Sequence, residues 1–156
     1  MQPLCRRRAS RCCLSTGTRC PAAAQSPIQA ATGWDLLGTW SSDCSIPPSR
    51  LHTWLSYVVR DGRLFYEQNY GDGRSSHEIA SARLLPDGNI EIVMKFTTVS
   101  PPQTRLNVNT RGADGRFRTI ESKNVGTGEY SIRDGLVSPN NQPSKWLSRC
   151  ATPPSS

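Results

Sequence analysis

The heptapeptide GTWSSDC, residues 38–44, and a distant cysteine, Cys150, decide the fold that this sequence predicts. A Gly-x-Trp strand with a cysteine just after it, and one more cysteine in the last segment, indicate a sheet fastened at its first and last strands. Two cysteines at opposite ends of a small domain can form a structural disulfide in an oxidising compartment. The alternative is two unrelated buried thiols. We predict a Cys44–Cys150 disulfide in an exported protein.

Short alternating segments separated by turns occupy the sequence between the two cysteines. Five Asp-Gly dipeptides occur there, at residues 61–62, 72–73, 87–88, 114–115 and 134–135. Asp-Gly between alternating segments is a strong hairpin signal, because both residues tolerate the positive φ of a tight turn. Each short turn makes the strands on either side antiparallel neighbours. The turns therefore predict an up-and-down meander.

The clearest strand covers residues 90–99, where apolar and polar side chains alternate. Alternate residues of a strand share one face, and the shared apolar face consists of Ile90, Ile92, Met94 and Phe96. Residues 104–111 show a similar alternation, in which Leu106 and Val108 are separated by arginine and asparagine. Both segments predict strands with one apolar face.

The fold class that these segments predict is all-β: an antiparallel up-and-down meander closed as a small barrel of eight or nine strands. Closure is favoured because it removes exposed strand edges. A two-sheet sandwich is the alternative, although sandwiches usually need long crossovers and the connections here are short. We expect the domain at residues 34–150, a flexible linker at 26–33 and a disordered tail at 151–156.

Residues 1–25 are expected to be either a degenerate signal peptide or a disordered leader. The arginine-rich start and the three alanines at 22–24 are typical of a secretory signal, whereas residues 12–19 are too polar for its apolar region. The predicted disulfide favours the signal peptide and a periplasmic or secreted location. No apolar run of 18 residues occurs that would span a membrane.

The formal net charge of +7 is concentrated at the start of the sequence. Five arginines lie within the first nineteen residues, where there is no acidic residue, and from Gln25 onward 14 basic residues face 12 acidic ones. A domain with nearly balanced charge lacks the basic surface that phosphate backbones require. We therefore expect no nucleic-acid partner for the folded part.

The Gly38-Thr39-Trp40 start, the meander and the cysteine pair resemble the lipocalin-like (calycin) barrels, most of all the small secreted lipocalin-like proteins of bacteria. The resemblance covers residues 36–150, and the Thr-Asp-Tyr motif of typical lipocalins is absent. It implies that Trp40 closes one end of the barrel and that an arginine of the last strands lies across it. Arg149 and Arg133 are the candidates, and Gly38, Trp40 and Arg149 make up the expected barrel-end motif.

The resemblance implies an exported protein that binds a small hydrophobic ligand in the barrel without catalysis. Trp54, Tyr66, Met94 and Phe96 are the residues expected to line the pocket, if they do not simply form the core. The alternative function is a protein-interaction module, such as an inhibitor of an exported protease that acts through an N-terminal arm at residues 26–32. We expect a monomer in either case.

An enzyme is the third hypothesis, with His77 acting beside Glu78 or Asp72. His52 and His77 are the only histidines, and surface or turn histidines are the simpler interpretation. No local nucleophile motif such as Gly-x-Ser-x-Gly occurs, and neither domain cysteine has a second ligand at zinc spacing. We therefore expect no catalytic residues, no metal and no cofactor.

Overall fold

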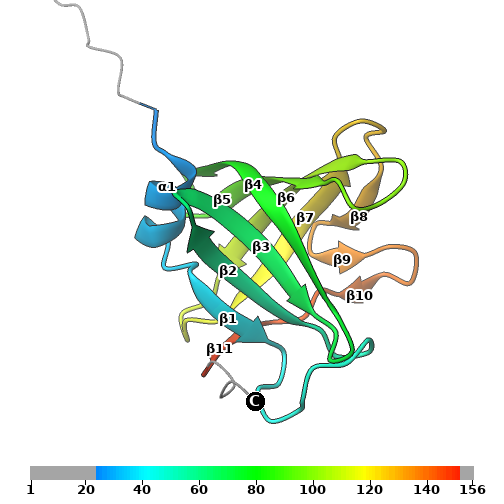
Figure 1. The fold of residues 1–156 in the computed structure, drawn as a ribbon. Helices are drawn as coiled ribbons and strands as arrows, with labels where there is room; N and C mark the ends of the chain where they lie inside the picture. Colours follow the sequence, from blue (N-terminus) through cyan, green and yellow to red (C-terminus); the bar gives the residue numbers. More distant parts are fainter. Residues whose placement is uncertain (1–23, 152–156) are drawn as a thin grey trace, which may run out of the picture.

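The computed structural model describes residues 24–151, which form one helix and one antiparallel sheet of eleven strands (Figure 1). The elements are α1 (Pro27–Gly33), β1 (Gly38–Ser41), β2 (Trp54–Arg60), β3 (Arg63–Asn69), β4 (Arg74–Leu84), β5 (Ile90–Phe96), β6 (Gln103–Arg111), β7 (Phe117–Asn124), β8 (Tyr130–Arg133), β9 (Leu136–Val137), β10 (Gln142–Pro143) and β11 (Ser148–Cys150). Strands β1 to β10 are neighbours in chain order, and β11 pairs with the free side of β1. The predicted all-β, up-and-down meander is confirmed.

Asp-Gly dipeptides close two of the hairpins as two-residue turns. Asp61 and Gly62 have φ values of 49° and 71°, and the residues on either side of them pair across β2 and β3. Two successive residues with positive φ form the kind of turn that matches the twist of a hairpin, and aspartate and glycine tolerate it best. Asp134 and Gly135 join β8 to β9 with similar values of 52° and 74°.

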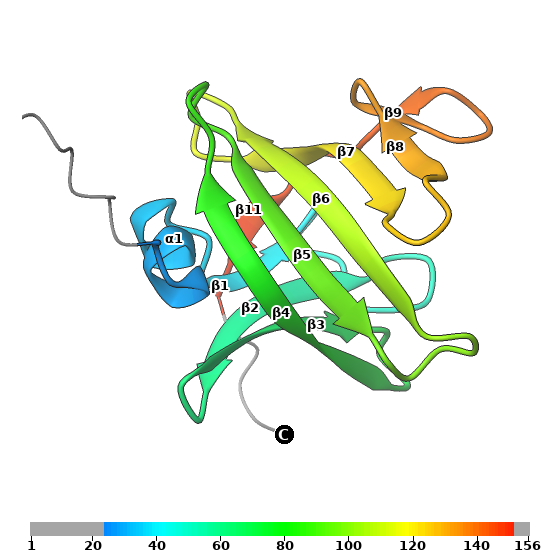
Figure 2. The ribbon, with the colours of Figure 1, turned by 90° about the horizontal axis from the view of Figure 1, so that it is seen from above.

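The sheet is not closed into a barrel. Within residues 24–151, β10 and β11 stand at opposite ends of the strand order and no ladder joins them. Figure 2 shows β9, the neighbour of β10, apart from β11 when the sheet is seen from above. The segment before β11 reaches β7 through one isolated bridge, in which the backbone N–H of Leu147 donates to the Phe117 carbonyl at 2.7 Å. Strands β9 and β10 contain two residues each, and Pro143 has no N–H to extend the ladder. The predicted closed barrel of eight or nine strands is therefore wrong, and a single sheet also rules out the sandwich.

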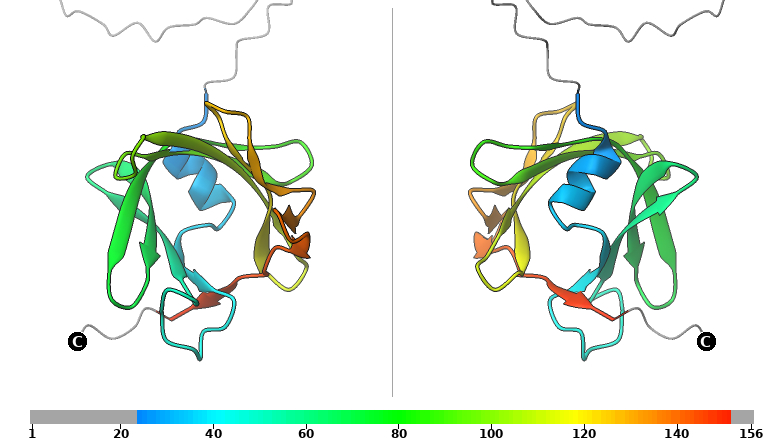
Figure 3. Two further views of the ribbon diagram at one scale, coloured as in Figure 1. Left: turned by 90° about the vertical axis from the view of Figure 1, so that its right-hand side faces the viewer. Right: turned by 90° about the vertical axis from the view of Figure 1, so that its left-hand side faces the viewer.

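Residues 26–33 form a capped helix, not the flexible linker that we predicted. The Ser26 hydroxyl accepts from the backbone N–H of Gln29 at 3.1 Å, and the Gln29 side chain accepts from the Ser26 N–H at 3.0 Å. This reciprocal pair is a capping box, and Pro27 stands in the first turn, where its missing N–H has no cost. Two alanines of α1 are fully buried, and the helix lies within the curve of the sheet (Figure 3).

The strand connections alternate between two ends of the sheet. We call one the helix end, which consists of α1 and the turns at 61–62, 85–89 and 112–116. We call the other the loop end, which consists of the connections at 42–53, 70–73, 97–102 and 125–129. Phe117 lies at the helix end, with its ring centroid 4.7 Å from that of Trp40 and 5.8 Å from that of Trp34. The aromatic core is therefore centred on the helix end.

The predicted disulfide between Cys44 and Cys150 is confirmed, with a Cα–Cα distance of 5.5 Å and a sequence separation of 106. It fastens β11 to β1, where Thr39 pairs with Cys150. Closing a loop of this length stabilises a fold by about 4–5 kcal/mol in the chain-entropy model. The bond indicates an oxidising, extracytoplasmic environment.

The predictions for the leader at 1–25 and the tail at 151–156 fall almost entirely outside the described residues. Within residues 24–151, no helix is both long enough and apolar enough to cross a membrane.

Candidate functional site

Three of the four predicted pocket residues lie together on the inner face of the sheet, the face turned toward α1. Tyr66 pairs directly with His77, and Met94 pairs with Ile79. Directly paired residues project from the same face, and the ring of Phe96 lies 6.3 Å from the ring of Tyr66. Tyr66 and Met94 belong to the buried core, against which Phe96 packs.

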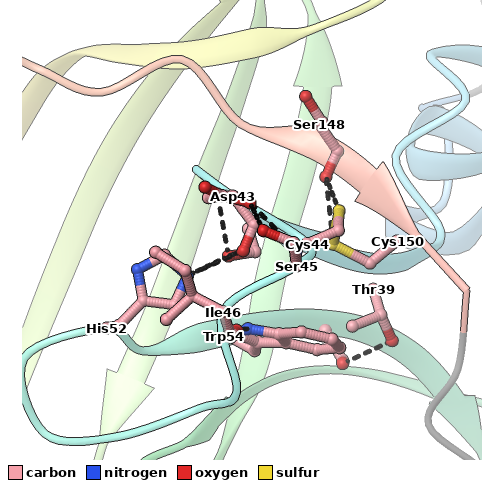
Figure 4. Close-up of a disulfide and its surroundings, with 11 residues drawn as sticks. Thr39, Asp43, Cys44, Ser45, Ile46, His52, Trp54, Ser148 and Cys150 are labelled. Atoms are coloured by element: carbon pink, nitrogen blue, oxygen red, sulfur yellow. Dashed lines mark hydrogen bonds between the residues drawn. A yellow bond between two sulfur atoms is a disulfide. The ribbon is translucent and has the colours of Figure 1, made fainter.

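Trp54 lies on the outer face, so its prediction as a pocket residue is wrong. Strand β2 pairs with β3 in a regular register, and Trp54 stands three residues before the inward-facing Tyr57, which places it on the opposite face. Its indole N–H donates to the Ile46 carbonyl at 3.0 Å, under the loop that carries Cys44 (Figure 4). Trp54 is buried by this loop, and Leu55 takes the inward position.

His77 lies in a cluster with two aromatic rings on the inner face and stacks most closely on Phe96. Its ring centroid lies 4.0 Å from that of Phe96 and 6.4 Å from that of Tyr66, and the residue is only 3% exposed. Burial lowers the pKa of His77, because the charged form loses its hydration. The imidazole is therefore neutral at pH 7.

A short hydrogen-bond network holds His77 in place. Its Nε2 lies 3.2 Å from the Ser75 hydroxyl, which lies 3.2 Å from the Gln68 side-chain oxygen. The Tyr70 hydroxyl donates to the same Gln68 oxygen at 2.8 Å. Nδ1 of His77 is buried and has no hydrogen-bond partner within the described residues. The ring is thus fixed at one nitrogen and unsatisfied at the other.

The carboxylates of the enzyme hypothesis do not join His77. Glu78 follows His77 in β4, so it projects from the opposite face, where Arg63 pairs with it at 3.3 Å. Asp72 pairs with Arg50 at 2.9 Å in exposed loops. The structure therefore places both acids in surface ion pairs and gives His77 neither of them as a partner.

Strand β6 turns its polar residues inward, which sequence reasoning missed. Arg105, Asn107 and Asn109 pair directly with Met94, Ile92 and Ile90, the inward face of β5. Asn109 is fully buried, and the Thr119 hydroxyl donates to its side-chain oxygen at 2.8 Å. The apolar side chains of β6 face outward instead. The inner face therefore changes from apolar on β5 to polar on β6 and on β7 beyond Phe117.

Arg105 is the inward-facing cation of this polar region. Its guanidinium donates to the Ser131 hydroxyl at 2.6 Å, which in turn lies 3.1 Å from the Ser122 hydroxyl. Within residues 24–151, no carboxylate lies at ion-pair distance from it. Burial is the largest effect on the pKa of the Tyr66 hydroxyl and raises it, and the charge of Arg105 is a smaller effect that lowers it. The side-chain oxygen of Asn107 is also buried without a partner among these residues.

The Gly-x-Trp motif has a structural role at the helix end. The Arg149 guanidinium lies 4.5 Å from the Trp40 ring and donates to backbone carbonyls just before β1. Gly38 has a φ of 125°, and a Cβ on it would come within 2.6 Å of the Arg149 guanidinium. The glycine therefore makes room for the arginine that covers the tryptophan. Arg133, the other candidate, lies over Tyr130 at 5.1 Å.

His52 braces the loop that carries the disulfide. Its Nε2 lies 2.8 Å from both the Ser41 hydroxyl and the Asp43 carbonyl oxygen (Figure 4). Ser41 is fully buried, so its hydroxyl cannot meet a substrate. These contacts fit a structural brace.

The described residues contain neither a metal site nor a large hollow at the helix end. Within residues 24–151, no group of three or more histidine, cysteine, aspartate or glutamate side chains could hold a metal ion. A hollow of about 160 Å³ lies at the helix end between the start of α1, β3 and β4. This is smaller than the roughly 300 Å³ at which small-molecule pockets usually begin.

Comparison with protein-family models, curated proteins and solved structures finds no match for the chain. The antiparallel meander and the disulfide are features of the structure itself, and the lipocalin-like resemblance still depends on them and on the Gly-x-Trp motif. The function must therefore be argued from the residues of the inner face.

Proposed function

We propose that the protein is an exported, lipocalin-like binding protein that holds a small ligand on the inner face at the loop end, without converting it chemically. The observation that supports this is the cluster of Tyr66, His77 and Phe96, in which one buried imidazole nitrogen has no partner among the described residues. Aromatic walls combined with a few unsatisfied polar groups are typical of small-molecule sites. The helix covers the other end of the same face.

Exposed apolar side chains at the loop end favour a ligand with an apolar part. Leu51 is 95% exposed, and the further exposed apolar side chains on these connections are Ile46, Val99 and Val125. They come from three of the four connections at this end. Exposed apolar side chains that gather in one region of a surface mark binding sites more often than scattered ones do. We infer that the ligand enters past these connections.

Export is proposed from the disulfide together with the expected leader. A Cys44–Cys150 bond persists in the periplasm or outside the cell, where thiols are not kept reduced. We therefore propose that the protein takes its ligand from an extracytoplasmic fluid, and, as a separate expectation, that it does so as a monomer.

Methionine methyl groups offer a direct test. The chain has two methionines, Met1 and Met94, and Met94 is 1% exposed on the inner face beside Ile79. The protein is labelled with [methyl-¹³C]methionine, and Met94→Leu assigns the signal. Titration with laurate, retinol or haem should shift the Met94 methyl resonance saturably. Tryptophan emission is a poorer reporter, because Trp40 lies at the helix end. No saturable shift with any of the three would contradict the proposal.

A protein-interaction module is the second candidate, favoured by the exposure of Leu51. The predicted arm cannot be residues 26–32, because these residues form α1 and pack against β4. An inhibitor would instead use the connections of the loop end.

Inhibition of an exported metalloprotease by the purified protein tests this second candidate. Leu51→Glu should weaken inhibition at least tenfold, whereas the matched Leu84→Glu, also on an exposed leucine, should not. Equal inhibition by both variants would reject an interface at the loop end.

A further inference from the structure

We propose that the ligand is an organic monoanion, namely a carboxylic acid with an apolar or aromatic body, and that Arg105 binds its charge. This inference rests on the ligand-binding function proposed above and adds to it the chemical class of the ligand.

The partners of Arg105 differ from those of the arginines that form ion pairs. Six arginines of the described chain contact carboxylates: Arg50, Arg60, Arg63, Arg83, Arg116 and Arg149. Arg105 instead faces inward beside the buried Met94, and its hydrogen bond is to a neutral hydroxyl, that of Ser131. A guanidinium has five N–H donors and is always charged, and its planar fork matches a carboxylate. A charge held on an inner face without a counterion favours an anionic partner.

Two buried polar atoms add unused hydrogen-bonding capacity to the same face. Nδ1 of His77 and Oδ1 of Asn107 have no hydrogen-bond partner in residues 24–151. Asn107 stands two residues from Arg105 on β6, so both side chains project from one face. Buried polar groups are nearly always paired in native proteins. Oδ1 of Asn107 is an acceptor, so a hydroxyl or amide group on the body of the ligand would have to donate to it, whereas the carboxylate itself can only accept and binds Arg105.

The apolar body of the ligand has its own surface beside the charge. Met94 pairs directly with Arg105 across β5 and β6, and Phe96 is the next inward-facing residue of β5. The ring of Phe96 lies 6.3 Å from that of Tyr66, so an aromatic surface begins two residues along β5 from the position that pairs with Arg105. A molecule with a carboxylate at one end and a hydrocarbon or aryl body would place its charge at the guanidinium and its body on the apolar side chains beside it.

The charge of the inner face matches one negative group. His77 is neutral at pH 7, because burial lowers its pKa. Arg111, another inward-facing arginine, lies at the helix end, 4.3 Å from the Trp34 ring, and donates to backbone carbonyls. Of His77, Arg111 and Arg105, it is therefore Arg105 that carries a positive charge at the loop end. A single cation favours a carboxylate over a phosphate dianion.

Two fluorescent probes with one skeleton test the inference. 1-Anilinonaphthalene-8-sulfonate and N-phenyl-1-naphthylamine differ by the sulfonate group, so the ratio of their affinities reports the contribution of the charge. Both are titrated against the full chain with its disulfide formed, and the methyl resonance of Met94 shows whether they bind on the inner face. The wild-type protein should bind the anionic probe about tenfold more tightly or better.

Arg105→Met should weaken binding of the sulfonate about tenfold or more and change binding of the neutral probe less than twofold. Arg105→Lys should retain part of the preference, since the charge remains. Arg74→Met is the matched control: Arg74 is an exposed cation at the loop-end start of β4, and its loss should change neither affinity more than twofold. Circular dichroism confirms that each variant is folded, and Arg105→Gln replaces Arg105→Met if the latter is not.

The outcomes separate the two proposals. Binding of both probes with equal affinity, or equal losses in Arg105→Met and Arg74→Met, would overturn the role of Arg105 and leave a neutral-ligand site standing. If neither these probes nor laurate, retinol or haem shift the Met94 resonance, the binding function itself fails, and the anion inference fails with it.

Discussion

The helix end and the loop end of this sheet bury their inner faces with different chemistry. At the helix end, α1 covers the face and Phe117 packs against Trp40. At the loop end, the same face carries His77, Arg105 and Asn107, and two of these three side chains have a buried atom without a partner in the described residues. One continuous sheet thus has a mainly apolar half, in which Nδ2 of Asn109 is also buried without a partner among the described residues, and a half with more unused polar groups.

The difference shows which part of the molecule the fold depends on. Apolar burial stabilises a domain, whereas a buried polar atom without a partner costs about 1–3 kcal/mol. Departures of this kind from good packing are expected mainly where a protein has a function to perform. We therefore propose that the helix end supplies most of the stability and that the loop end carries the proposed binding function.

Truncating one phenylalanine at each end should give the largest contrast. Phe117 is 1% exposed, whereas Phe96 is only partly buried. Phe117→Ala should lower the free energy of unfolding by about 3–5 kcal/mol, the range for a buried aromatic side chain. Phe96→Ala should lower the free energy of unfolding by less than half as much. Equal losses in urea denaturation would mean that the loop end is packed as well as the helix end.

Much of the frame could be predicted from local sequence signals. The Gly-x-Trp motif is a reliable signal because Arg149 occupies the space that a Cβ on Gly38 would need. The Asp-Gly turns work because positive φ is required at both of their positions. The disulfide followed from two cysteines at opposite ends of one domain. Each of these signals depends on a few neighbouring residues or on a single covalent bond.

The inner face could not be predicted in the same way. Alternation divides β6 into two faces but does not say which face turns inward, and a shift of one residue exchanges them. Arg105 and Asn107 therefore gave no sign of their position until the register with β5 was known. The same ambiguity placed Trp54 on the wrong side. The helix was not predicted because its seven residues are too few to show a helical periodicity, although Ser26 and Gln29 carry its capping signal.

Gly38→Ala should produce the next largest decrease in the free energy of unfolding, at the helix end. The φ of 125° is strained for any residue with a side chain, and the new methyl group would displace the guanidinium that covers Trp40. We expect a loss of about 2–3 kcal/mol in the free energy of unfolding. Gly33→Ala is the control, since an added Cβ there meets no atom within 4 Å. A loss of similar size in the control would show that clash and strain are not the cause.

Ser26→Ala should cost about 1 kcal/mol, the usual value of an N-cap side chain. The variant loses the hydroxyl that accepts from the Gln29 N–H, and Ser26→Asp should restore most of the stability because aspartate also caps. Thermal unfolding measures both variants. Probe affinity at the loop end should remain unchanged, and a change there would show that the two ends are coupled.

A pH dependence centred on His77 should be the smallest effect and should belong to the loop end. Because burial lowers the pKa of His77 below its ordinary value of 6.5, the unfolded chain binds this proton first as the pH falls. The free energy of unfolding should therefore decrease from pH 7.5 to pH 5, and part of this decrease should be absent in His77→Phe. The carboxylates with lowered pKa, Asp43 and Asp114, titrate below this window. An identical decrease in His77→Phe would show that the buried imidazole is not destabilised by protonation, and the polar half of the inner face would then have to be more accessible to water than its burial implies.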